Sequence, residues 1–228
     1  MKCFLLLLLM IITNQCLFAN NKDSSMNKQK EKFEIPLTED LMREHGILNR
    51  ILLIYEEIIK RIENDIDFQI ATLTNAVSII KSFIEDYHEK LEETYVFPLF
   101  EKYKKETKLI KTLKNQHNKG REITAQLQKL LTTNETLHQK NKKLIKILLQ
   151  KFITMYRPHE AREDTVLFPQ IRSLISEQEF KELGEKFEEL EHKLFGEEGF
   201  EKMVKKVEDI EKELGIYQLE QFTPDLKK

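Results

Sequence analysis

The sequence predicts an all-α protein: an up-down-up-down four-helix bundle followed by a short C-terminal helical appendage. Apolar residues recur at helical spacing through four long stretches, and short polar segments join these stretches. A content of 40% hydrophobic and 33% charged residues, with few Gly or Pro, suits a mostly helical protein. The segments 87–100 and 158–171 repeat one another, which indicates a single helical hairpin present twice.

Residues 1–19 have the layout of a secretory signal peptide, and residues 20–36 read as a flexible linker. The apolar run 3–12 is about half the length that a bilayer span needs, about 20 residues. We therefore expect export to the periplasm or the extracellular space, with no membrane span in the mature chain. An uncleaved membrane anchor and lipid attachment at Cys16 are the alternatives. Both cysteines lie in this leader, so the mature chain offers no thiolate ligand or disulfide.

The bundle is expected to occupy residues 37–175. Its first helix should start at Thr38, through a hydroxyl cap, its second near Asp67 and its third near Thr107. The polar segment 132–135 then marks the turn before the fourth helix.

Pro158 lies inside the fourth helical stretch and is expected to kink it. Pro98 and Pro169 lie near the ends of the second and fourth helices. Residues 176–214 then predict a pair of shorter helices, and residues 215–228 a tail.

The charge pattern argues against a nucleic-acid partner. The net charge is −2, and acidic and basic residues interleave along the helices, as at Glu57 and Arg61. Such pairs are typical of solvated helical faces. We expect a small-molecule partner instead, and the sequence makes no prediction of oligomeric state.

Four histidines and two glutamates of the repeat indicate a two-metal site. In each copy a histidine and a glutamate stand four residues apart, so both point to the same side of a helix. A further histidine lies on the apolar stripe of the preceding helix. Buried carboxylates without partners cost several kcal/mol each, and bound cations would remove that penalty. The predicted ligands are His45, His88, Glu92, His117, His159 and Glu163.

Imidazole and carboxylate donors without sulfur suit iron, manganese or zinc. If both glutamates bridge, one ion takes His45 and His88, and the other takes His117 and His159. Each ion then has four protein donors, which leaves room for an oxo or hydroxo bridge and an open position. Open positions favour small-molecule chemistry over a purely structural role.

The order His…His-x-x-x-Glu, present twice, resembles the hemerythrin-like HHE cation-binding proteins. The resemblance covers about residues 37–219 and includes the appendage. It implies a four-helix bundle that holds two iron ions (Fe2+/Fe3+). It also implies an exported non-haem di-iron protein that binds O2 or NO for sensing, scavenging or carriage. The alternatives are a di-iron peroxidase, oxidase or NO reductase, and an iron donor or storage protein of the repair-of-iron-centres type.

Two positions depart from the oxygen carriers of this family. Arg121 stands where those proteins have a fifth histidine. The resulting set of four histidines and two glutamates is similar to repair-of-iron-centres proteins and to the iron- and oxygen-sensing domain of an F-box protein. The carriers also bridge with an aspartate five residues after a histidine, a place that Asp164 matches. Glu163 is preferred because its spacing of four residues points it toward His159, and Asp164 stays as the alternative.

Four other acidic or histidine residues are considered as possible metal ligands. Glu89 and Glu160 each follow a ligand histidine, and they are interpreted as outward charges, with an extra metal donor as the alternative. His138 and His192 lie outside the repeat and are expected at the surface.

Overall fold

The computed structural model describes residues 35–132 and 139–226. These residues form helices and short connections without a β-strand among them, so the all-α prediction is confirmed. The described residues make one compact unit, which includes the C-terminal appendage. Every helix among the described residues is too short or too polar to span a lipid bilayer. The predicted signal peptide, nearly all of the linker, His138 and most of the turn at 132–135 lie outside the described residues.

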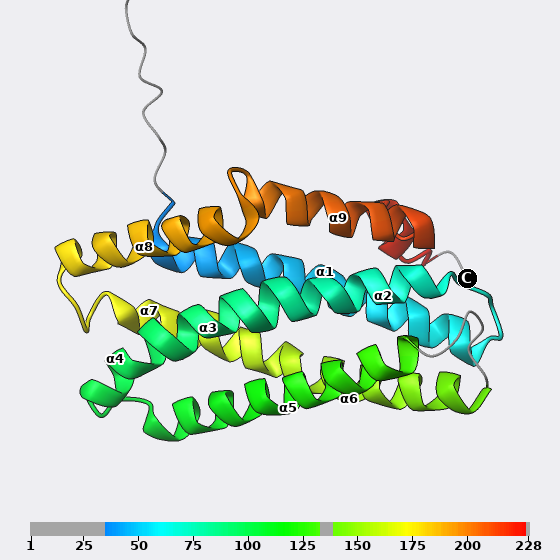
Figure 1. The fold of residues 1–228 in the computed structure, drawn as a ribbon, viewed down its shortest axis with the longest axis horizontal. Helices are drawn as coiled ribbons and strands as arrows, with labels where there is room; N and C mark the ends of the chain where they lie inside the picture. The colour runs from blue at the N-terminus through cyan, green and yellow to red at the C-terminus, as the bar shows by residue number, and fades with distance from the viewer. Residues whose placement is uncertain (1–34, 133–138, 227–228) are drawn as a thin grey trace, which may run out of the picture. The chain divides into compact units, whose positions relative to one another are not determined.

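Six helical stretches follow one another along the described chain (Figure 1). The first and third stretches are the single helices α1 (Leu37–Glu63) and α5 (Thr107–Leu131). The second runs without a break through α2 (Ile70–Ile79), the π-helical η1 (Ile80–His88), α3 (Glu89–Leu91), the π-helical η2 (Glu92–Val96) and α4 (Phe97–Lys102). The fourth joins α6 (Gln139–Arg162), the π-helical η3 (Glu163–Leu167) and α7 (Phe168–Ile171). The appendage holds the fifth and sixth stretches, α8 (Glu177–Phe195) and α9 (Gly199–Leu214), and the tail contains the 3-10 turn η4 (Leu219–Phe222).

Two predicted helix starts are wrong. No side chain caps α1: Pro36 occupies the N-cap position, and its carbonyl accepts a hydrogen bond from the Asp40 amide at 3.0 Å, so Thr38 is already inside the helix. A proline at this point has its φ angle preset and needs no amide hydrogen bond. The second stretch starts at Ile70, three residues later than Asp67. The start near Thr107 is confirmed.

The appendage starts as its sequence predicts. The Ser176 hydroxyl accepts a hydrogen bond from the Glu179 amide, while the Glu179 carboxylate accepts one from the Ser176 amide. This reciprocal pair is a capping box, which satisfies two amides at the start of α8.

Both Phe-Pro pairs follow a π-helical turn that begins at a predicted ligand. In each turn the phenylalanine amide donates to the carbonyl five residues earlier, which belongs to Glu92 or Glu163. A proline has no amide hydrogen and its ring crowds the preceding turn, and the wider π turn accommodates Pro98 and Pro169. Pro158, in contrast, lies within α6, which continues to Arg162. The kink expected there stays a prediction.

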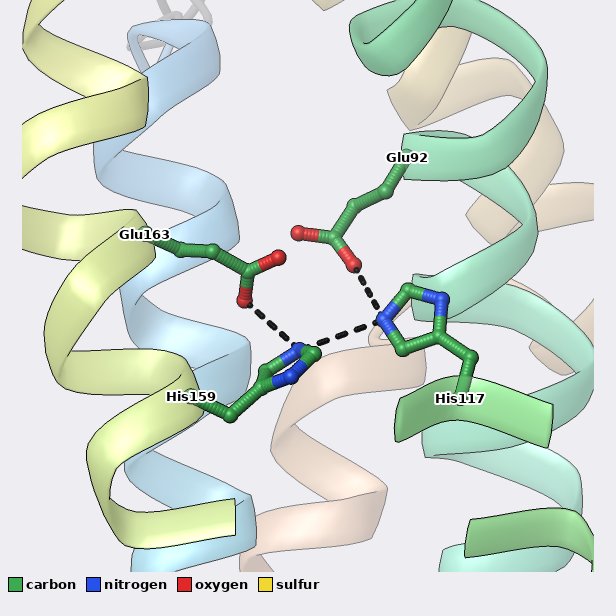
Figure 2. A group of neighbouring side chains, drawn as sticks. All are labelled: Glu92, His117, His159 and Glu163. Atoms are coloured by element: carbon green, nitrogen blue, oxygen red, sulfur yellow. Dashed lines mark hydrogen bonds and ion pairs between the residues drawn. The ribbon is translucent and has the colours of Figure 1, made fainter. Parts of the chain in front are cut away.

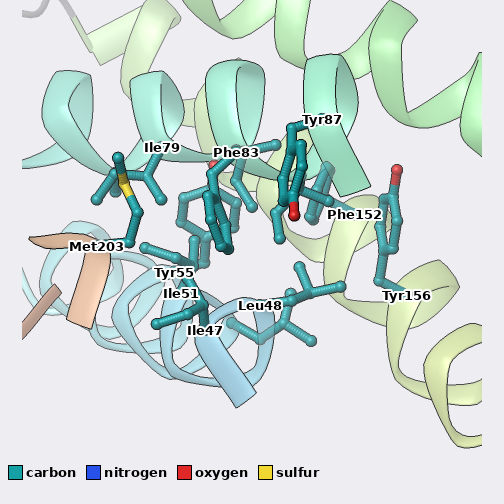
Figure 3. Packing of buried hydrophobic residues seen from close by; sticks show 14 of the residues in the cluster. Ile47, Leu48, Ile51, Tyr55, Ile79, Phe83, Tyr87, Phe152, Tyr156 and Met203 are labelled. Carbon is teal, nitrogen blue, oxygen red and sulfur yellow. The ribbon is translucent and has the colours of Figure 1, made fainter. Parts of the chain in front are cut away.

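The core lies between the long helices and brings the two hairpins together. α1 packs on α6 and η1, and α5 also packs on α6 and η1. Aromatic side chains fill the space between them, with Tyr55 5.5 Å from Phe152 and Phe152 4.3 Å from Tyr156, between ring centroids. Met203 of α9 is buried in the same cluster, so the appendage shares this core (Figure 3).

Candidate metal centre

Each of the four predicted histidine ligands comes from a different helical stretch. His45 lies on α1, His88 ends η1, His117 is in the middle of α5, and His159 is near the end of α6. All four are buried, with at most 3% of each residue exposed. Four helices therefore aim one imidazole each into a dry interior.

The four imidazoles form two pairs. The Nε2 atoms of His45 and His88 are 3.0 Å apart, and those of His117 and His159 are 3.2 Å apart. These are the two pairs that the sequence assigned to separate metal ions. Nitrogen atoms at this distance present two lone pairs to one place, which suits a shared cation.

The two glutamates lie between the histidine pairs. Each carboxylate faces one histidine of each pair. Figure 2 shows the two carboxylates with the second pair, Glu92 beside His117 and Glu163 beside His159. Both residues are fully buried, at the first positions of η2 and η3. The Nε2-to-oxygen distances to Glu163 are 3.5 Å from His45 and 3.1 Å from His159, and those to Glu92 are 3.7 Å from His88 and 3.4 Å from His117.

The other ring nitrogen of every histidine has an oxygen partner, which we call its outer partner. Such a bond orients the ring, places the proton on Nδ1 and leaves Nε2 free to bind a metal. The four Nδ1-to-oxygen distances are 2.7 Å from His45 to Asp164, 2.6 Å from His88 to Glu44, 3.1 Å from His117 to Glu93 and 2.9 Å from His159 to Gln116.

Sequence reasoning did not identify these outer partners. It considered Asp164 only as an alternative bridging ligand, whereas the side chain of Asp164 bonds the far side of the His45 ring. One signal was available in the sequence. Each partner is the immediate neighbour of a predicted ligand, at equivalent places in the two repeats: Glu44 before His45, Gln116 before His117, Glu93 after Glu92 and Asp164 after Glu163.

The environment of the two buried carboxylates indicates whether the site fits metal ions. All four carboxylate oxygens of Glu92 and Glu163 are buried and accept no hydrogen bond from the described residues. Burial raises the pKa of Glu163 well above its usual range, and the negative charge of Glu92 adds to this rise. Two such carboxylates are unfavourable unless positive charge lies between them. The donor set therefore fits bound metal ions.

The histidines of the second pair differ in charge when no metal is present. Burial alone would lower the pKa of His117, but the carboxylates of Glu89, Glu92 and Glu93 raise it to about 10. Burial, with the positive charge of His117, lowers the pKa of His159 to about 3. His117 therefore carries a proton at neutral pH that a metal ion must displace.

The outward orientation expected of Glu89 and Glu160 is wrong. Both are buried, with 1% and 3% of their surface exposed. Glu89 accepts a hydrogen bond of 2.6 Å from the Tyr156 hydroxyl and pairs with Arg121 at 2.7 Å. Arg121 also pairs with Glu93 at 2.6 Å, so it belongs to the layer around the ligands. His192, on α8, is partly exposed and stands apart from the centre.

Comparisons with known proteins identify the family of the chain. The model of the hemerythrin HHE cation-binding domain matches residues 37–171. Proteins of Mycobacterium bovis and Mycobacterium tuberculosis, described only as uncharacterized, are 48% identical over 193 residues, which is 84% of this chain and 76% of theirs. No solved structure matches the chain.

Proposed function

Because the chain belongs to the hemerythrin HHE cation-binding family, we propose that it is a non-haem di-iron protein. In this proposal His45 and His88 hold one iron ion, and His117 and His159 hold the other. Glu92 and Glu163 bridge the ions. The main support is that six buried donor side chains lie close together. Two of them, the carboxylates of Glu92 and Glu163, have no hydrogen-bond partner among the described residues.

We further propose that the four long helical stretches form the up-down-up-down bundle expected of this family. The packing of α1 on α6 and η1, and of α5 on the same two elements, supports this arrangement. Each stretch then contributes one histidine, so the bundle holds the ligands in place through its core packing. The appendage covers one side of it through α1, which packs on both α8 and α9.

The proposed ligand is O2 or NO, bound for sensing, scavenging or carriage. Bound iron would supply the redox chemistry that holds such a molecule. The chain supplies a buried site, the two carboxylates and four imidazoles whose Nδ1 atoms are bonded to outer partners. The absence of a fifth histidine at Arg121 leaves each ion with four protein donors, and hence with room for a small ligand. Residues 1–19 support export as part of this proposal.

A di-iron peroxidase, oxidase or NO reductase is the second candidate, and Tyr156 favours it. The Tyr156 ring lies 5.4 Å from the His159 ring, and its hydroxyl donates to the buried Glu89 carboxylate. Burial raises the pKa of Glu89, with its nearest positive groups opposing the rise. A buried phenol beside a carboxyl that can take up a proton suits proton delivery to a reacting small molecule.

Metal analysis and absorption spectroscopy on protein purified without added metal test the proposal. We expect two iron ions per chain and an absorption change that appears with O2 or NO and reverses when the gas is removed. Irreversible oxidation with consumption of H2O2 would favour the enzyme. Two ions of manganese or zinc would replace iron in the proposal, and a chain that binds no metal would refute it.

A further inference from the structure

Each π-helical turn beside the metal centre contacts one histidine of another helical stretch in three ways. A carboxylate oxygen of Glu92 lies 3.4 Å from Nε2 of His117, and one of Glu93 lies 3.1 Å from Nδ1 of the same ring. The Phe97 ring stacks on that imidazole, with ring centroids 5.5 Å apart and planes inclined by 24°. The imidazole of α5 is therefore held at both nitrogen atoms and on one face.

The fourth stretch repeats these contacts on His45 of α1. A carboxylate oxygen of Glu163 lies 3.5 Å from Nε2 of His45, and one of Asp164 lies 2.7 Å from Nδ1. The Phe168 ring stacks on the imidazole, with ring centroids 5.5 Å apart and planes inclined by 19°. Two matching arrangements at equivalent places of the repeat indicate a built feature of the fold.

The π-helical turn brings each phenylalanine to the histidine side of its helix. On a regular α-helix the fifth residue after a ligand stands about 140° around the axis from it. The turns η2 and η3 instead close with a hydrogen bond from the phenylalanine amide to the carbonyl of the glutamate five residues earlier. This wider turn returns the fifth residue towards the side of the first. The Phe-Pro pairs of the sequence thus acquire a place in the centre.

Both stacked rings are completely buried, and so is Phe100, which lies one turn after Phe97 on α4. Among the described residues, the ring neighbours of the four predicted ligand histidines are the histidines themselves, Tyr156 and the two phenylalanines Phe97 and Phe168. Phe100 therefore shares the burial of Phe97 without its contact to a ligand.

We propose that Phe97 and Phe168 are positioning residues of the metal centre, each of which fixes the plane of one ligand histidine. This inference rests on the proposed metal centre. A hydrogen bond at Nδ1 holds one edge of an imidazole but leaves its plane free to tilt about that bond. A phenyl ring stacked on one face removes this freedom, so that Nε2 stays directed at the metal ion. Phe97 acts in this way on the second pair of histidines, and Phe168 on the first pair.

Release of Zn2+ tests the proposal, because this ion suits imidazole and carboxylate donors. The full chain is loaded with two Zn2+ ions and mixed with a chromogenic chelator, which reports the rate at which each ion leaves. Phe97→Leu and Phe168→Leu should each speed the release of one ion about twofold to tenfold, the range for an aromatic contact. The other ion should leave at its wild-type rate. The double variant should release both ions faster.

Nuclear magnetic resonance of the same Zn2+-loaded chain, which is diamagnetic, shows which histidine each ring orients. Removing a phenyl ring removes its ring current from the stacked imidazole. Phe97→Leu should therefore shift the imidazole signals of His117, and Phe168→Leu those of His45. A general loss of core packing would not divide the signals in this way.

Phe100→Leu is the matched control, since it makes the same change at an equally buried place on the same helix. It should leave the release rates and the imidazole signals at their wild-type values. If a leucine variant unfolds by circular dichroism, the more adaptable methionine takes its place. Folded variants that release both ions at the wild-type rate, or an equal effect of Phe100→Leu, would overturn this inference alone. A wild-type chain that binds no Zn2+ would overturn the metal centre as well.

Discussion

The two halves of the metal centre have equivalent predicted ligands but different outer partners. In the first half, His45 and His88 bond the carboxylates of Asp164 and Glu44. In the second half, His117 bonds Glu93, and His159 bonds the neutral amide of Gln116. The repeat therefore preserves the donors while the groups behind them have diverged.

This difference changes the charge behind each pair of imidazoles. Glu93 forms ion pairs of 2.6 Å with both Arg121 and Lys90, which offset its negative charge. Within the described residues, the ion pairs of Asp164 and Glu44 are those with the histidines themselves. A carboxylate behind an imidazole makes the ring a stronger metal ligand. We therefore expect the first half to bind its metal ion more tightly than the second half.

The largest effect on metal binding is expected when one histidine is removed from each half in separate variants. His88→Ala and His159→Ala should each abolish binding of at least one metal ion. Each variant removes a metal ligand and leaves a buried carboxylate with less positive charge beside it. His88→Ala should lower the total metal content more, since it disrupts the half that binds first. Elemental analysis of both variants gives the answer, with His138→Ala as the control that keeps its metal. A full metal content in His88→Ala would count against the site itself.

Converting the outer partner of the second half should sharpen the comparison. Gln116→Glu places a carboxylate behind His159, as Glu44 is placed behind His88. The affinity for the weaker metal ion should rise about tenfold, the lower end of the range for outer partners. Stepwise metal titration followed by calorimetry measures both affinities. Asn115→Asp adds the same charge one residue away on the exposed face of α5, and it should have little effect. Equal gains in the two variants would mean that overall charge, rather than the hydrogen bond, sets the affinity.

The sequence was sufficient to predict which residues meet in the centre. His88 and Glu92 are four residues apart on one apolar stripe, so they had to point to the same side of one helix. The repeat predicts the same arrangement for His159 and Glu163 in the second hairpin. The outer partners were not predictable in this way, because some of them reach across hairpins. Glu93 extends from η2 to a histidine on α5, and Asp164 extends from η3 to a histidine on α1. Such pairings depend on how helices pack, which one helical period does not specify.

The burial of Glu89 shows the same limit. A glutamate next to a ligand should face away from it on an isolated helix, and the sequence was interpreted in that sense. In the protein, Tyr156 and Arg121 come from two other helices and give the carboxylate a donor and a cation. A buried charge of this kind is stable only with those partners. Its environment is therefore set by tertiary contacts that no local pattern reveals.

The second half should also release a proton when metal binds. Without metal the pKa of His117 is about 10, so its ring is protonated throughout the neutral range. At pH 8, binding should release at least about one proton, and apparent affinity should fall as the pH is lowered. Calorimetry in two buffers with different ionisation enthalpies measures that number. A heat of binding that does not depend on the buffer would contradict it.

The same pKa predicts how the stability of the metal-free chain depends on pH. Since the folded pKa of His117 is raised above the ordinary value of 6.5, its stabilising contribution is complete below pH 6.5 and is lost as the pH rises through about 10. Chemical unfolding of the metal-free protein between pH 7 and pH 10 should show this decline. His117→Gln, which cannot take up a proton, should reduce the slope.

Two glycines extend the comparison to stability, with the smallest expected effects. Gly120 lies in the second half, where an added Cβ atom would meet the Tyr156 hydroxyl oxygen at 2.0 Å. Gly46 lies in the first half, beside His45, and an added Cβ atom there meets nothing within 4 Å. Gly120→Ala should therefore destabilise the fold by about 1–3 kcal/mol, because a buried ring must move. Gly46→Ala should stabilise it by about 0.5–1 kcal/mol, because alanine favours a helix.

Chemical unfolding of the two glycine variants tests whether Tyr156 is the reason for the difference. Tyr156→Phe combined with Gly120→Ala removes the closest atom, so the pair should be coupled and the double variant less unstable than the sum of the single changes. Gly46→Ala with Tyr156→Phe should be additive, since Gly46 has no neighbour to clash with. If Gly120→Ala proved as stable as wild type, α5 and α6 could move apart to accommodate the added Cβ atom without any loss of stability. The second half would then be held by its metal ion more than by its packing.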